Sequence, residues 1–173
     1  MRHEWMTLPK AYRASRTAYT PAMTDVRMID VGSKEITRRR ALARAEVHIN
    51  DEGLAKIEEG TVAKGDVFAT ARVAGIAAAK KTPDLLPLCH PLMLDYVRVD
   101  LVVDRAAGCV RIEAECALDG RTGVEMEALV SVSAAALCVH DMLKSTDPEI
   151  RIDGIALYEK DGGKSGSWRR SGA

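Results

Sequence analysis

The feature that most constrains the fold is the stretch Ala128 to Val139, ALVSVSAAALCV, which is apolar on nearly every side of a helix. A helix of this kind is buried on more than one face, because it has no polar stripe to turn toward water. The stretch is also much shorter than the roughly 20 apolar residues of a membrane span. It therefore predicts a helix over about 123–144 that packs on its own domain and, with its other side, on another subunit.

Four segments alternate apolar and polar residues as half-buried strands do. They cover residues 43–49, 97–103, 110–118 and 150–158. The turn from Asp104 to Gly108 joins the second and third segments, which predicts a hairpin. Residues 30–41, just before the first strand, are charged and are expected to be turn-like.

Two more helices are predicted before the hairpin. One begins near Asp66, which can cap it, and reaches Lys81, with Pro83 as the stop signal. A shorter one covers Gly53 to Glu59. The order of the main elements is βαββαβ, which predicts an α+β, ferredoxin-like split βαβ fold. Its antiparallel sheet would have the helices packed on one face.

Length and charge limit the domain organisation and the partners. The 173 residues suit one domain, expected over 28–167, with a disordered N-terminal extension at 1–27 and a flexible tail at 168–173. A net charge of zero argues against a broad nucleic-acid surface. The four cysteines lack zinc-type CxxC spacing and suit reduced thiols, so we expect a cytoplasmic protein. From the charge and the short apolar stretch, we expect that it binds neither nucleic acid nor membrane.

The segment LPLCHPL, residues 86–92, is the first concentrated motif. Pro91 pushes His90 toward extended backbone and Pro87 fixes the entry, so the imidazole is oriented to donate to a phosphate or another ligand oxygen. The alternative is a rigid loop whose histidine bonds only within the protein. A Cys89–His90 nucleophilic pair is disfavoured, because adjacent extended residues point to opposite faces.

The segment TGVEMEAL, residues 122–129, begins the long helix. Thr122 and Glu125 fit a capping box, which would be a structural role for Glu125. Glu127 has no such role. Two carboxylates here could bind the amino-pyrimidine edge of guanine, where donors outnumber acceptors. Met126 could pack on a flat ring or fill the core.

The other end of the long helix carries Asp141 and Lys144, which can meet at i and i+3. They form either an ordinary ion pair or an acid–base pair. Glu127 and Asp141 are 14 residues apart, about 21 Å along a helix that rises 1.5 Å per residue. If both serve one site, a neighbouring subunit must supply one of them.

Basic and glycine-rich segments complete the set. Lys64 precedes a helix start, where a cation and backbone amides could meet a phosphate. Lys160 and Lys164 flank two glycines in a tail that could close over an anionic ligand or remain solvated. The GKSG sequence there is not a Walker motif, because Tyr158 occupies the required earlier glycine position. There is no dedicated carboxylate cage for Mg²⁺, which can nevertheless accompany a triphosphate.

In this order, KGDVFATARVAGI, LPLCHPL, TGVEMEAL, DMLK and GGKSG resemble the cyclic pyranopterin monophosphate synthase family of molybdenum cofactor biosynthesis. The resemblance covers about residues 28–167 and implies a catalytic, ferredoxin-like domain. It implies a lyase that converts 3′,8-cyclo-7,8-dihydroguanosine 5′-triphosphate to cyclic pyranopterin monophosphate and pyrophosphate. It also implies dimers assembled to a hexamer, with active sites at the dimer interface.

The resemblance also implies roles for single residues, whereas the sequence itself indicates no required cofactor and leaves Mg²⁺ possible with the triphosphate. The catalytic set would be Asp141, Lys144 and Lys64, and the substrate contacts would be Leu88, Cys89, His90, Glu125, Met126, Glu127 and Lys160. Two other classes stay open. One is a ligand-sensing module that binds a nucleotide without turnover. The other, which ranks third, is a nucleic-acid-binding domain.

Overall fold

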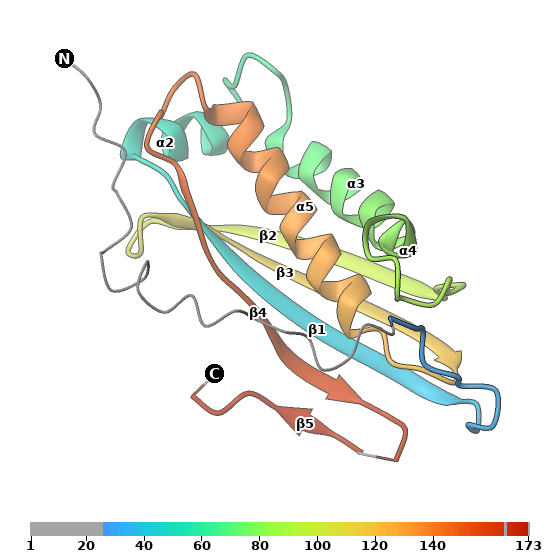
Figure 1. Ribbon diagram of the computed structural model, residues 1–173. Coiled ribbons are helices and arrows are strands. Elements are labelled where there is room, and N and C mark those ends of the chain that lie inside the picture. Colours follow the sequence, from blue (N-terminus) through green and yellow to red (C-terminus); the bar gives the residue numbers. More distant parts are fainter. Residues whose placement is uncertain (1–25, 165, 173) are drawn as a thin grey trace, which may run out of the picture.

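A computed structural model describes residues 26–164 and 166–172. The elements in chain order are β1 (Thr37–His48), α2 (Asp51–Glu59), α3 (Val67–Ala79), α4 (Thr82–Leu85), β2 (Tyr96–Asp104), β3 (Cys109–Gly120), α5 (Glu125–Leu143), β4 (Arg151–Asp161) and β5 (Trp168–Arg169) (Figure 1). The strands form one sheet in the order β2-β3-β1-β4-β5, and all neighbours are antiparallel. The predicted α+β, ferredoxin-like βαββαβ arrangement is confirmed, with β5 added at one edge.

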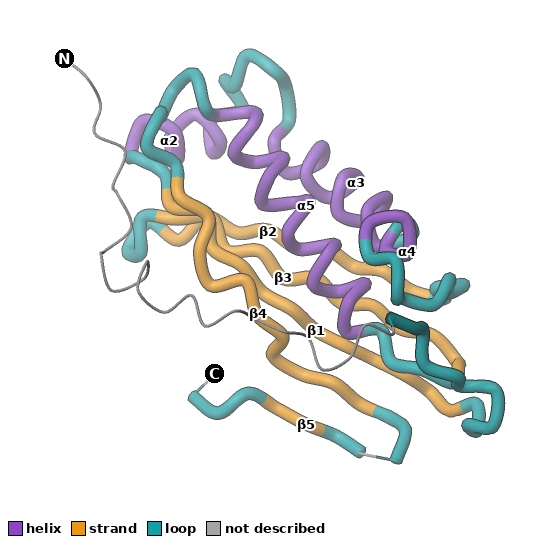
Figure 2. The backbone as a smooth tube through the Cα atoms, viewed as in Figure 1, coloured by secondary structure: helices purple, strands orange, loops and turns teal. Residues whose placement is uncertain are grey.

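The helices cover one face of this sheet. Figure 2 shows α3 and α5 side by side over the strands, and α5 contacts β1, β3 and β4. The side chains of β1 that face α5 are small: Ala41, Ala43 and Ala45 are at most 1% exposed. A floor of alanines lets the long helix lie close to the sheet. The core is therefore a thin layer between one sheet and two helices.

Close packing between α3 and α5 depends on a glycine. A Cβ atom on Gly75 would lie 3.0 Å from the backbone oxygen of Ser131 and 3.1 Å from a methyl carbon of Val99. Contacts that short would push the helices apart. Gly75, in the middle of α3, thus fixes how near the two helices approach.

The other face of the sheet is charged, and none of the helices in the described residues lies on it (Figure 1). Arg40 on β1 donates to Glu115 on β3 and to Glu159 on β4, with both N–O distances at 2.8 Å. These two acids raise the pKa of the Arg40 guanidinium. The expectation that residues 30–41 are turn-like is wrong for 37–41, which belong to β1. Carboxylates on both neighbouring strands pair with the basic segment, and this pairing holds it extended.

The predicted helix over 66–81 has its expected cap, because the Asp66 side chain accepts from the N–H of Ala69 at 2.9 Å. It ends at Ala79, and Pro83 does not follow it as a plain break. Pro83 lies in the first turn of α4, where a proline needs no intrahelical N–H partner.

Trp168 and Arg169, inside the segment expected as a flexible tail, pair with Lys160 and Glu159 of β4. Residues 1–25 of the expected N-terminal extension lie outside the described part of the chain.

Helix α5 is, by its 19 residues and its composition, long and apolar enough to cross a membrane. In the fold it is a core helix. Its side toward the sheet and α3 is fully buried, at Ala128, Val132, Ala135 and Val139. On its outer side Leu137 is 62% exposed, so the described residues cover only part of the apolar surface of α5.

Candidate active site

A pocket of about 320 Å³ opens at the N-terminal end of α5. The predicted substrate-binding residues from both motifs lie in its walls: Leu88, Cys89, His90, Glu125, Met126 and Glu127. The first three come from the loop after α4, and the others from the first turn of α5. The fold thus brings two motifs that are more than thirty residues apart in sequence to one hollow.

The loop that carries Cys89 and His90 is built from consecutive turns. The N–H of Leu86 donates to Thr82 at 2.9 Å, and the N–H of Cys89 donates to Leu86 at 2.9 Å. Pro87 inside the second turn and Pro91 after it restrict the backbone further. Burial, and then the negative charge of Glu127, raise the pKa of the Cys89 thiol. Cys89 is therefore a lining group and not an activated nucleophile.

The predicted capping box at the start of α5 is wrong. The residue before the helix is Val124, and no side chain caps it. Glu125 is the first helical residue, too early for the reciprocal bond of a capping box. Its carboxylate instead accepts from the Lys160 ammonium of β4 at 3.2 Å. Lys160, predicted separately from the tail, is thereby held beside the pocket.

Glu127 is the buried acid of the pocket. The residue is only 3% exposed, and within the described chain no cation pairs with its carboxyl group. Burial raises the pKa of Glu127 to about 7, the nearby Glu125 adds to this rise, and a bond to its own backbone N–H opposes it. Two neighbouring carboxyls thus differ, since Glu125 is paired with Lys160 and Glu127 can hold a proton near neutral pH.

The C-terminal end of α5 carries a second cluster. The Asp141 carboxylate lies 2.8 Å from the Lys144 ammonium and 2.6 Å from that of Lys64. The Lys64 ammonium also donates to the Asp141 backbone oxygen at 3.0 Å. Hydrogen bonds from Lys144 and Lys64 lower the pKa of Asp141 to about 2. The predicted i,i+3 pair is present, and Lys64 of the loop before α3 joins it.

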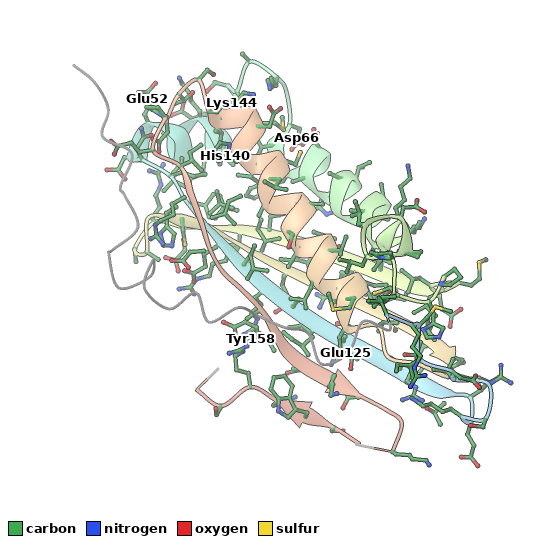
Figure 3. The ribbon with its side chains drawn as sticks, viewed as in Figure 1. Glu52, Asp66, Glu125, His140, Lys144 and Tyr158 are labelled. Atoms are coloured by element: carbon green, nitrogen blue, oxygen red, sulfur yellow. The ribbon has the colours of Figure 1, made fainter. Side chains whose placement is uncertain are left out.

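The two groups of residues stand at opposite ends of one helix. Figure 3 shows Lys144 at one end of α5 and Glu125 at the other. The helix has 19 residues, about 28 Å at 1.5 Å per residue. One chain therefore does not bring the acidic pocket and the Asp141 cluster together.

A larger hollow, about 720 Å³, lies on the helix-free face between Arg44 and Tyr158. It contains none of the predicted residues. Its cations are already used, since Arg44 pairs with Glu113 at 2.9 Å and stacks on the Tyr158 ring. We place the site in the smaller pocket because that one holds an unpaired buried acid. Within the described ranges no three or more His, Cys, Asp and Glu side chains are grouped as metal ligands would be.

Sequence patterns did not identify a third wall of the pocket. Ile29, Val31 and Lys34 line it from the segment before β1. Arg39 also lies near, with its guanidinium donating to the backbone oxygen of Gly120 at 3.1 Å. The only signal for these residues was the charged character of the segment. That does not say which way a side chain points.

Comparison with known proteins matches most of the chain, including both ends of α5, to one family. The model of the MoaC family matches residues 28–163. The cyclic pyranopterin monophosphate synthase of Roseiflexus sp. (strain RS-1) is 54% identical over 142 residues, which are 82% of this chain and 90% of that protein. The synthase of Thermomicrobium roseum (strain ATCC 27502 / DSM 5159 / P-2) is 54% identical over 144 residues, 83% of this chain and 87% of that protein. That of Brucella ovis (strain ATCC 25840 / 63/290 / NCTC 10512) is 52% identical over 141 residues, 82% and 86% of the two chains. The chain described here belongs to the MoaC family.

Proposed function

We propose that this chain is a cyclic pyranopterin monophosphate synthase, a lyase of molybdenum cofactor biosynthesis. It converts 3′,8-cyclo-7,8-dihydroguanosine 5′-triphosphate to cyclic pyranopterin monophosphate and pyrophosphate. The observation that carries the proposal is that one helix, α5, has an acidic pocket at its start and a lysine–aspartate–lysine cluster at its end. The chain that carries both groups is 54% identical to proteins of that name over 142 and 144 residues.

The acidic pocket recognises the guanine-derived part of the substrate. That part carries an amino-pyrimidine edge rich in N–H donors, which a carboxylate accepts well. Glu127 lies at the floor of the pocket, and Met126 and Leu88 supply apolar surface for a flat ring. His90 lines the same hollow and can donate to a phosphate or sugar oxygen.

The Asp141 cluster supplies the charge for phosphate chemistry. In the reaction the imidazole ring of the guanine opens and a pyrazine ring closes. A sugar hydroxyl then attacks the α-phosphorus, the bond to the β-phosphate breaks, and pyrophosphate leaves. Asp141 is a weak base because its pKa is about 2, so it holds the two ammonium groups in place. Lys64 and Lys144 donate protons and stabilise phosphate charge, and Lys160 and His90 stabilise it from the pocket.

A substrate that needs both clusters must lie between two chains. Glu127 and Asp141 are about 21 Å apart along α5, farther than one compact nucleotide reaches. In a two-fold dimer each patch meets its counterpart reciprocally, so one protomer gives the acidic pocket and its partner gives the lysine cluster. The exposed Leu137 on the outer side of α5 fits burial by another copy. We propose a homo-oligomer of dimers assembled to a hexamer.

A complementation experiment tests both the activity and the shared site. Wild-type protein mixed with the cyclised nucleotide should release pyrophosphate, whereas a ligand-sensing module would bind without releasing it. Glu127→Gln and Asp141→Asn variants should each be nearly inactive. After unfolding and refolding together, they should regain about a quarter of wild-type activity, because half of the dimers are mixed and each has one intact site.

The controls are each variant refolded alone, which should stay inactive. Wild-type protein refolded in the same way sets the scale. If the mixture stays as inactive as the single variants while wild-type recovers, the site does not draw on two chains. If Asp141→Asn alone keeps near-normal turnover, Asp141 has no part in the reaction.

We also propose that no cofactor takes part and that Mg²⁺ enters only with the triphosphate. Lys64, Lys144 and Lys160 can carry the phosphate charge in its place. Turnover that persists in a chelator would support this, and a complete, Mg²⁺-reversible loss would contradict it. The cytoplasm is the expected location, since all four cysteines are free thiols.

A further inference from the structure

The segment before β1 is fixed against the loop that leads into α5. Its turn closes with the N–H of Lys34 donating to Val31 at 3.0 Å. The backbone oxygen of Lys34 then accepts from the Arg121 guanidinium at 3.2 Å. In Figure 1 this segment, drawn in blue, lies beside the start of α5. The turn is thus held at the mouth of the pocket, where Lys34 lines the wall.

Lys34 places a positive charge at the mouth of the pocket that no nearby carboxylate of the described residues neutralises. The Glu125 carboxylate already has the Lys160 ammonium at 3.2 Å. Glu127 is buried at the floor, where its carboxyl can hold a proton. Across residues 26–164 and 166–172, the Lys34 ammonium has no hydrogen-bond or ion-pair partner, and the residue is exposed. An ammonium in this position attracts an anionic group of whatever enters.

The start of α5 adds to the same potential. No side chain caps the helix at Val124, and the Glu127 N–H is bonded to its own carboxyl, so the N–H groups of Glu125 and Met126 are the first-turn donors left without a side-chain acceptor among the described residues. Backbone N–H groups at a helix start favour an anion, and His90 lines the same space as a further donor. A phosphate oxygen near the mouth would meet the lysine, the imidazole and the helix start together.

We propose that Lys34 is a further substrate-binding residue of this pocket, which pairs with a phosphate oxygen of the ligand. The inference rests on the proposed function for the identity of the ligand. It adds the segment over 29–34 to the site as a third wall, beside the loop of His90 and the start of α5.

The test compares Lys34→Met, which keeps the aliphatic stem, with Lys34→Arg, which keeps the charge. Lys80→Ala is the control, since that lysine is exposed at the end of α3 and does not line the pocket. Lys34→Met should raise KM about tenfold and change kcat less, because a charge-assisted hydrogen bond to the ligand is lost. It should also weaken inhibition by added pyrophosphate and flatten the salt dependence of kcat/KM. Lys34→Arg should keep most of the wild-type KM.

Equal KM, equal pyrophosphate inhibition and equal salt dependence for Lys34→Met and wild type would overturn the inference. So would a Lys34→Arg variant as impaired as Lys34→Met. If wild-type protein releases no pyrophosphate from the nucleotide, the proposed function fails instead. Calorimetric binding of pyrophosphate to wild type and Lys34→Met then still tests Lys34, and equal affinities overturn its role.

Discussion

Glu127 couples the acidic pocket to the stability of the whole domain. The residue is 3% exposed and, within the described chain, its carboxyl has no cation beside it, so the ionised form is costly in the fold. In the unfolded chain the same group is solvated and titrates near its usual value. Replacing Glu127 with Gln keeps the size and removes the titration. We therefore expect the variant to differ from wild type in how its stability depends on pH.

The sign and the size follow from the two pKa values. The folded-state pKa of Glu127 is about 7 and its ordinary pKa is 4.5. Between these values the unfolded chain has released the proton and the folded chain has kept it, so stability falls as pH rises. At about 1.4 kcal/mol per pH unit, the wild type should lose about 3 kcal/mol across this window and little more above it. The Gln variant should lack this loss.

The assay is urea unfolding of both proteins at pH values from 4 to 8.5, at one protein concentration because association also affects stability. The free energy of unfolding of Glu127→Gln minus that of wild type should rise by about 3 kcal/mol from pH 4 to pH 8. Taking the difference cancels groups that titrate equally in both proteins. A difference that stays constant with pH would refute the argument that Glu127 is a desolvated, unpaired acid.

Three further substitutions test single contacts that stabilise the fold. Gly75→Val should lower the free energy of unfolding by about 2 kcal/mol or more, because the added atoms meet the Ser131 backbone oxygen. Ala77→Val on the exposed side of α3 is the control. Equal effects of the two substitutions on stability would contradict the close approach of α3 and α5. Asp147 is 6% exposed and accepts two backbone N–H groups at 2.7 and 2.9 Å, so Asp147→Ala should cost about 2 kcal/mol in a thermal or urea scan. Asp147→Asn should recover part of this, and an Asn variant as unstable as the Ala variant would show that the acceptor oxygens are not the cause. Arg40→Met should destabilise by about 1 kcal/mol at low salt, because Glu115 and Glu159 each lose one cation and keep only Arg98 and Arg169 as partners. Arg40→Lys should lie between, and wild-type stability in the Met variant would mean that the bridge contributes nothing.

Features set by neighbours along the chain could be predicted from the sequence. Alternation predicted the strands, Asp66 predicted the start of α3, and the i,i+3 spacing predicted the Asp141–Lys144 pair. The resemblance supplied the family and the candidate site residues, which the structure then placed. These predictions succeed because strand and helix geometry fixes which nearby residues share a face.

Contacts between distant segments were decided by tertiary structure. The sequence suggested a local capping role for Glu125, but the sheet order puts β4 beside the helix start and gives it Lys160 instead. Lys64 reaches Asp141 across 77 residues, and Lys34 enters the pocket through a turn held by Arg121. Side-chain periodicity tells which face of an element is buried. Only the packing of elements against one another determines which polar group it meets there, because that meeting depends on sheet order, on how closely helices such as α3 and α5 approach, and on which loops border the same pocket.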